Sequence, residues 1–81
     1  MGEIVLYGAN WCGDCRRAKA WLREHEVPFT EVDVEHDDDA RDRAVDLAGG
    51  RKNIPVVVLP DDRVLVEPTN AELAAAIAPE A

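Results

Sequence analysis

The sequence predicts an α/β fold in which one four-stranded mixed sheet is flanked by three helices, in the order βαβαββα. Three observations lead to this class. Two apolar runs enclose an amphipathic stretch, which is typical of a strand–helix–strand unit with parallel strands. Two further apolar runs are joined too tightly to pair in any way but antiparallel. The chain has 81 residues without repeats or linkers, so a single domain is predicted over residues 1–81.

The first strand–helix–strand unit is expected over residues 3–34. Residues 3–8 read E-I-V-L-Y-G, a run rich in β-branched and aromatic side chains, and residues 29–34 alternate in polarity. The helix between them is predicted over residues 12–26, because proline at position 28 disfavours helical geometry in the residue before it. Its buried face is predicted to contain Cys15, Ala18, Leu22 and His25. Its opposite face is predicted to carry the charges of Arg16, Arg17, Lys19, Arg23 and Glu24.

The second half of the chain completes the sheet and adds two helices. Residues 40–48 have helical spacing and end at a Gly-Gly pair, which stops a helix readily. Residues 55–59 and 64–67 are predicted to form a hairpin around an Asp-Asp turn. A capping box, Thr69-x-x-Glu72, then opens the last helix. The buried side of that helix is predicted to contain Leu73, Ala76 and Ile77.

Composition excludes two classes of partner. The chain has 17 acidic and 9 basic side chains, which gives a formal net charge of −8. This charge opposes binding to nucleic acid and to anionic membrane surfaces, because both require clustered lysine and arginine. No apolar run approaches the ~20 residues that cross a bilayer, and residues 1–3 lack the positive start of a secretory signal. We therefore expect a cytosolic monomer.

Two cysteines, Cys12 and Cys15, lie where the first predicted strand passes into the first helix. The free N–H groups and the positive dipole end of a helix N-terminus favour an anion, so Cys12 is expected to be the thiolate nucleophile. Cys15 follows one helical turn later, close enough to form a disulfide with Cys12. We expect Cys12 to attack a substrate disulfide and Cys15, the less exposed thiol, to resolve the mixed disulfide.

A hydrophobic–proline pair, Ile54-Pro55, leads into the third strand, where a proline can adopt the cis form. A C-x-x-C motif between the first strand and the first helix, followed by such a pair before a hairpin, resembles the thioredoxin fold. The short βαβαββα order is similar to that of glutaredoxins over essentially the whole chain. The resemblance implies a cis peptide at Pro55 beside the cysteines and an Ile54 backbone that pairs with bound substrate.

Within this superfamily, the chain most resembles mycoredoxins and NrdH-type redoxins. The segments that carry this resemblance are Tyr7 with Trp11–Cys15, Glu31–His36 and Pro68–Asn70. Substrate contacts are expected from Tyr7, Trp11, Gly13, Asp14, Ile54, Pro55, Thr69 and Asn70. The alternative role of Trp11 is packing at the edge of the core. For Thr69 and Asn70 the alternatives are helix capping alone and binding of a small thiol's carboxylate at the helix N-terminus.

The resemblance also implies a thiol-disulfide oxidoreductase that reduces protein disulfides, or their mixed disulfides with a low-molecular-weight thiol, without a bound cofactor. Mycothiol or glutathione is then the expected co-substrate, and a flavoprotein reductase is the alternative electron donor.

The chain departs from these families at three places. The Cys-Pro-Tyr-Cys motif common in glutaredoxins is Cys12-Gly13-Asp14-Cys15 here. The Gly-Gly pair that helps glutaredoxins hold glutathione is replaced by Glu67-Pro68-Thr69-Asn70. Leu6 stands where thioredoxins have a buried aspartate, so the resemblance supplies no internal base for Cys15.

A different class of function, a non-catalytic carrier of a metal or an iron–sulfur cluster through Cys12, is the alternative interpretation of the C-x-x-C motif. A closed zinc site needs four ligands, and beyond the two cysteines the sequence offers only His25 and His36, both on other parts of the predicted fold. No metal ligand is therefore assigned. A cluster would require an added thiol ligand from outside the chain.

Overall fold

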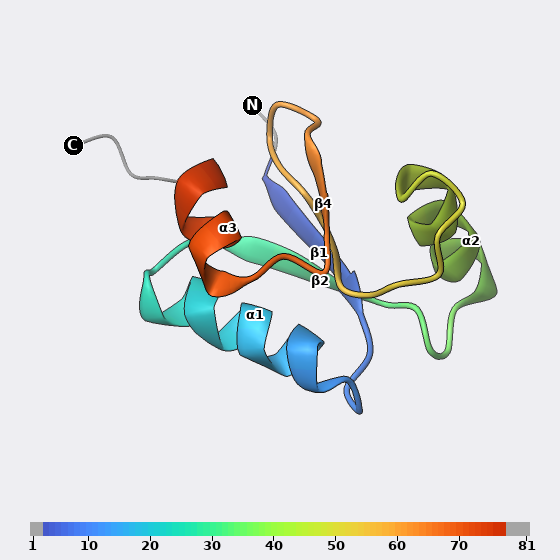
Figure 1. Cartoon of the computed structure of the whole chain (residues 1–81). Helices are drawn as coiled ribbons and strands as arrows, with labels where there is room; N and C mark the ends of the chain where they lie inside the picture. Colours follow the sequence, from blue (N-terminus) through green and yellow to red (C-terminus); the bar gives the residue numbers. More distant parts are fainter. Residues whose placement is uncertain (1–2, 78–81) are drawn as a thin grey trace.

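The computed structural model describes residues 3–77. The two limits of the predicted domain, residues 1 and 81, lie outside the described residues, and so do residues 1 and 2, which were considered above for a secretory signal. The elements are β1 (Ile4–Gly8), α1 (Gly13–Glu24), β2 (Phe29–Asp33), α2 (Asp38–Leu47), β3 (Val56–Val58), β4 (Val64–Val66) and α3 (Asn70–Ala76). The predicted order and fold class are confirmed (Figure 1). None of the helices within residues 3–77 is long and apolar enough to span a membrane.

The sheet has the strand order β2-β1-β3-β4. β1 pairs in parallel with β2 and antiparallel with β3, and β3 pairs antiparallel with β4. Leu6 occupies the centre of this register, since its neighbours are Glu31 on β2 and Val57 on β3. β1 is an inner strand, so the chain leaves the sheet between β2 and β3 before it enters α1. The two cysteines lie at the start of this helix.

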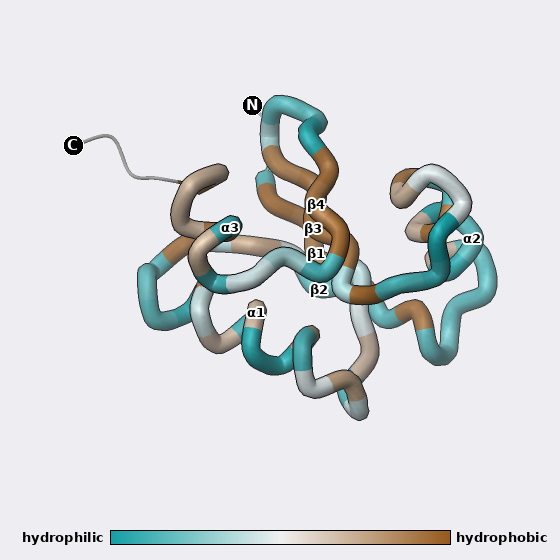
Figure 2. The backbone as a smooth tube through the Cα atoms, viewed as in Figure 1, coloured by the Kyte–Doolittle hydropathy of each residue, from teal (hydrophilic) through white to brown (hydrophobic). Residues whose placement is uncertain are grey.

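Side chains alternate across the strands and so build a core on each face of the sheet. One core, against α1 and α3, contains Ile4, Leu6, Ala18, Leu22, Val57, Leu59 and Leu73. The other, against α2, contains Tyr7, Val34, Ala40, Ala44, Ala48 and Val56. The strands carry most of the apolar colour in Figure 2, with α1 and α3 on one side and α2 on the other. Burial of each large aliphatic side chain stabilises the fold by about 1.5–3 kcal/mol.

Several elements end a residue or two inside their predicted limits, each for a local reason. Cys12 is the N-cap of α1 and has an extended backbone, so the helix proper begins at Gly13. Glu26 has a φ of 56°, which is outside the helical region, and the helix ends at Glu24. Glu67 has a φ of 50°, so it cannot continue β4 as predicted.

Two side chains of α1 lie opposite to their predicted faces. Lys19 was predicted on the charged, solvated face, but it is only 6% exposed, because its aliphatic stem packs inward while its ammonium reaches Glu31 on β2. His25 was predicted on the buried face, but it is exposed. The helix ends before it, so His25 is the C-cap, and its ring stacks on Trp21 with 4.0 Å between ring centroids.

Candidate active site

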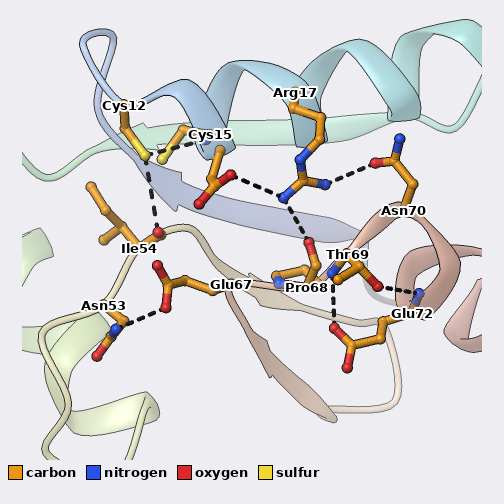
Figure 3. A network of polar contacts seen from close by, with 11 residues as sticks. Cys12, Cys15, Arg17, Asn53, Ile54, Glu67, Pro68, Thr69, Asn70 and Glu72 are labelled. Carbon is orange, nitrogen blue, oxygen red and sulfur yellow. Dashed lines mark hydrogen bonds and ion pairs between the residues drawn. The ribbon is translucent and has the colours of Figure 1, made fainter.

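Cys12 lies at the N-terminus of α1 with its sulfur directed along the helix start (Figure 3). The backbone N–H of Cys15 donates to Cys12 Sγ at 3.2 Å, and the Cys12 thiol faces the carbonyl oxygen of Ile54 at 4.0 Å. A backbone N–H group therefore points at the Cys12 sulfur where α1 begins, and helix N-termini favour anions in general. The same sulfur also lies beside a backbone acceptor, the Ile54 carbonyl.

Cys15 lies behind Cys12 and is the more buried of the two thiols. Its side chain has no exposed surface, whereas Cys12 is 9% exposed, which confirms the predicted order of exposure. Both cysteines are free thiols in this structure. Burial raises the pKa of the Cys15 thiol to about 12, with a further contribution from its hydrogen bond with Cys12. Cys15 is accordingly held as a neutral thiol behind Cys12.

Ile54 and Pro55 close the site on the side of the β3 entry. Their peptide bond is cis, as the family resemblance implied. Pro55 is fully buried and its carbonyl oxygen accepts the N–H of Glu67 at 2.8 Å, so the segment is tied to the end of β4. Ile54 is half-buried and packs against both cysteines. The Ile54 carbonyl therefore lies beside Cys12, just ahead of β3.

Trp11 forms the other wall of the site entrance. It is 65% exposed and its indole N–H donates to the carboxylate of Glu35. Trp11 and Ile54 both line a groove of about 550 Å³ that runs toward α2 and also contacts Arg51 and Lys52. A groove of this size is within the range of small-molecule sites. The exposed indole is thus placed to contact whatever approaches Cys12.

Three other residues that sequence reasoning assigned to substrate contact lie in different settings. Gly13 and Asp14 are exposed in the first turn of α1, and Asp14 accepts from Arg17 at 3.5 Å. Tyr7 instead belongs to the core beneath α2, where it is 7% exposed and its hydroxyl accepts from Arg43 at 3.2 Å. Strand alternation explains this, because Tyr7 and Leu6 face opposite sides of the sheet.

Thr69 and Asn70 lie at the start of α3, and their polar groups are engaged within the chain (Figure 3). Thr69 Oγ1 accepts the N–H of Glu72 at 3.0 Å, and the Glu72 carboxylate accepts the N–H of Thr69 at 2.8 Å, so the predicted capping box is confirmed. Asn70 Oδ1 accepts from Arg17 at 2.8 Å, and the Pro68 carbonyl accepts from Arg17 at 3.0 Å. The side-chain oxygens of Thr69 and Asn70 are therefore both engaged within the chain.

Sequence reasoning missed three residues that shape the site. Arg17 joins α1 to the segment before α3, and Gly8 leaves the space that Cys15 Sγ fills. Lys19 lies one helical turn beyond Cys15, and this spacing indicates that the two side chains share a helix face. Lysine is usually exposed, so the sequence alone favoured a solvated side chain there. Across residues 3–77, no group of three or more His, Cys, Asp or Glu side chains gathers as the ligands of a metal ion would.

The fold and the paired cysteines at the first helix define a small redox protein of the thioredoxin superfamily. The glutaredoxin family model matches residues 4–64, and the chain belongs to the glutaredoxin family. A protein of Mycobacterium tuberculosis that is named as a candidate glutaredoxin is 32% identical over 72 residues, which cover 89% of this chain and 86% of that protein.

Two solved structures share the fold. A glutaredoxin from Archaeoglobus fulgidus superposes with a TM-score of 0.83 at 21% identity, covering 98% of this chain and 89% of the other. The NrdH-redoxin of Escherichia coli superposes with a TM-score of 0.80, also at 21% identity, covering 99% of this chain and all of the other. At 21% identity, these two superpositions establish that this chain has the same fold as the two proteins.

Proposed function

We propose that the protein is a dithiol thiol-disulfide oxidoreductase, with Cys12 as the nucleophile and Cys15 as the resolving thiol. The observation that carries this proposal is the contact at the helix start, where the N–H of Cys15 points at Cys12 Sγ from 3.2 Å. It supports a thiolate on Cys12, the less buried of the two sulfurs, and a neutral thiol directly behind it. Membership of the glutaredoxin family supports the same chemistry.

The reaction proceeds in two exchange steps. The Cys12 thiolate attacks one sulfur of a substrate disulfide, the substrate S–S bond breaks, and the departing thiolate takes up a proton. Cys15 then loses its proton and attacks Cys12 Sγ, which breaks the mixed disulfide and releases the second substrate thiol. The substrate gains two electrons and two protons, and the protein is left with a Cys12–Cys15 disulfide. Two equivalents of a low-molecular-weight thiol return it to the dithiol.

The groove beside Trp11 and Ile54 is the proposed site for the non-sulfur part of a mixed disulfide. Its volume of about 550 Å³ suits a low-molecular-weight thiol such as mycothiol or glutathione. At the start of α3, where Thr69 and Asn70 were expected to contact substrate, the Thr69 N–H and hydroxyl are bound to Glu72, and Asn70 Oδ1 is bound to Arg17. This favours a thiol that does not depend on a carboxylate contact there, and hence mycothiol over glutathione.

Single-cysteine variants test the proposal directly. Cys12→Ser is expected to abolish reduction of a mixed disulfide between a test protein and mycothiol. Cys15→Ser is expected to retain the first attack, so a covalent adduct whose mass increase equals the transferred thiol should accumulate in a mass spectrum. Full activity in Cys12→Ser would refute the assignment.

The source of electrons needs its own measurement. The oxidised protein is incubated either with NADPH and thioredoxin reductase, or with mycothiol, and the loss of the Cys12–Cys15 disulfide is followed. We expect reduction by mycothiol and none by the reductase. Rapid reduction by the flavoprotein alone would instead assign the protein to the electron supply of NrdH-type redoxins.

A further inference from the structure

Lys19 is a buried charged side chain in the core side of α1. Its side chain is 8% exposed, and its ammonium donates to Glu31 Oε2 at 2.6 Å. The Glu31 side chain is one-third exposed, so one end of the pair is solvated and the other is not. A lysine of this kind is retained only with a partner, because an isolated buried ammonium is strongly destabilising. The burial of Lys19 therefore cannot be explained as that of an ordinary surface charge.

Two observations place this charge on the same side of α1 as the resolving thiol. Lys19 follows Cys15 by four residues on α1, so their side chains lie on the same helix face. Glu31 pairs with Leu6 in the parallel register of β1 and β2, and Leu6 belongs to the core against α1. Paired residues of neighbouring strands share a face, so Glu31 projects toward α1 and fixes the lysine there.

The other charges on the elements around Cys15 are placed differently. On α1, Asp14 and Arg16 are exposed and Arg17 is engaged with the segment before α3. β1 carries no charged residue between Ile4 and Gly8. On β2, the Asp33 carboxylate is bound to His36 and to the N–H of Glu35. The elements packed around Cys15 therefore present a single buried cation, Lys19, in the part of the chain that the structure describes.

We infer that Lys19, held in place by Glu31, is a positioning residue for the resolving step: its fixed positive charge stabilises the thiolate that forms on Cys15. The inference rests on the proposed function, in which Cys15 must ionise behind the mixed disulfide. In that step Cys15 loses its proton to solvent, its sulfur bonds to Cys12 Sγ, and the substrate thiolate leaves and is protonated. No external oxidant or reductant enters this step.

The electrostatics of Cys15 agree with this role. Burial holds the pKa of the Cys15 thiol far above its ordinary value, while the Lys19 charge acts in the opposite direction. Position 6 is leucine and offers no carboxylate to accept the proton of Cys15. The buried thiol therefore depends on a nearby cation to reach the ionised form. Glu31 has the contrary effect, because it partly neutralises the lysine.

The test follows the two phases of the reaction between the reduced protein and an equimolar amount of dithiobis-nitrobenzoate, in a stopped-flow instrument over a range of pH. The first equivalent of thionitrobenzoate reports attack by Cys12, and the second reports resolution by Cys15. Lys19→Met is expected to slow the second phase about tenfold near neutral pH and to displace its pH profile upward by about one pH unit. Glu31→Gln, which leaves the lysine uncompensated, is expected to displace the profile downward.

Arg16→Met is the matched control, because it removes the same charge from the same helix at an exposed position. It should leave the second phase within about twofold of the wild type. A purely structural role for the ion pair would slow both Lys19→Met and Glu31→Gln, so displacement of the two profiles in the same direction overturns the inference. An unchanged profile in Lys19→Met also overturns it.

The two proposals fail in distinguishable ways. If the proposed function is wrong, the wild-type protein will not release two equivalents of thionitrobenzoate in two phases. If only the role of Lys19 is wrong, both phases will be present in every variant, and the second will not follow the charge. Thermal unfolding of each variant establishes that the compared proteins are folded.

Discussion

Gly8 lies directly against Cys15: a Cβ atom built on residue 8 would come within 2.7 Å of Cys15 Sγ. It would also lie 3.1 Å from Cys15 Cβ and 3.2 Å from Leu6 Cδ2. A separation below 3.0 Å from a fully buried sulfur cannot be relieved without movement of the helix or the strand. The last residue of β1 is therefore glycine because Cys15 Sγ occupies the space that a side chain would need.

Gly8→Ala is expected to destabilise the reduced protein by about 1–3 kcal/mol through overpacking. The measurement is denaturant unfolding. Gly13→Ala is the control, since a Cβ there meets nothing within 4 Å and the residue is already helical, so its stability should be unchanged or slightly raised. In a Cys15→Ala background the cost of Gly8→Ala should shrink; an equal cost in both backgrounds would show that the sulfur is not the obstacle.

Stability of the reduced protein should fall at alkaline pH because of Cys15. Its folded-state pKa of about 12 lies above the ordinary value of 9.0, so its contribution is complete below pH 9.0 and is lost as pH rises toward 12. The greatest expected slope is about 1.4 kcal/mol per pH unit. Unfolding free energies of the wild type and of Cys15→Ala, measured with reductant across this range, check it. Equal slopes in the two proteins would contradict the prediction.

The exposed side chains of His36 and Asp33 should each shift the pKa of the other. The hydrogen bond at 2.8 Å raises the pKa of His36 above 6.5 and lowers the pKa of Asp33 below 3.8. Their mutual stabilisation is therefore complete between pH 3.8 and 6.5, and is lost as pH rises through the pKa of His36 or falls through that of Asp33. NMR titration of His36 should give a lower pKa in Asp33→Asn. Asp61→Asn, a control on the β3–β4 turn, should leave it unchanged.

Arg17 should anchor the segment between β4 and α3. Its guanidinium donates to the Pro68 carbonyl at 3.0 Å and to Asn70 Oδ1 at 2.8 Å, and it is about one-third exposed. Allowing for solvent screening, Arg17→Met is expected to cost about 1 kcal/mol in unfolding free energy. Amide hydrogen exchange at Asn70 should accelerate. Arg16→Met, which changes an exposed neighbour, should do neither; comparable effects from both variants would mean that the anchoring contacts contribute nothing.

The element order was predictable from the sequence because each element is encoded locally. The alternation in residues 29–34, the capping box at Thr69 and the proline at position 28 each act within a few residues. The same holds for Cys12, since its place at a helix start follows from the strand that precedes it and the helical pattern that follows. The family resemblance added the cis peptide at Pro55.

The settings of Tyr7, Lys19 and Gly8 depend on contacts between distant segments. Side chains alternate along β1, so Tyr7 must face the side of the sheet opposite to Leu6. The sequence does not reveal that α2 is the helix that covers the Tyr7 side. Lysine is seldom buried, so Lys19 was assigned to solvent until Glu31 of β2 supplied its partner. The approach of Gly8 to Cys15 is likewise a product of how α1 packs on the sheet.

The exposure of Trp11 supplies the protein with its own optical reporter. The indole is 65% exposed and immediately precedes Cys12 in the chain, while the second tryptophan, Trp21, stacks on His25 farther along α1. A disulfide between Cys12 and Cys15, as proposed, would form next to Trp11 in the chain, so we expect the indole emission to differ between the dithiol and disulfide states. The fluorescence of this one side chain would then report the redox state of the protein without an added label.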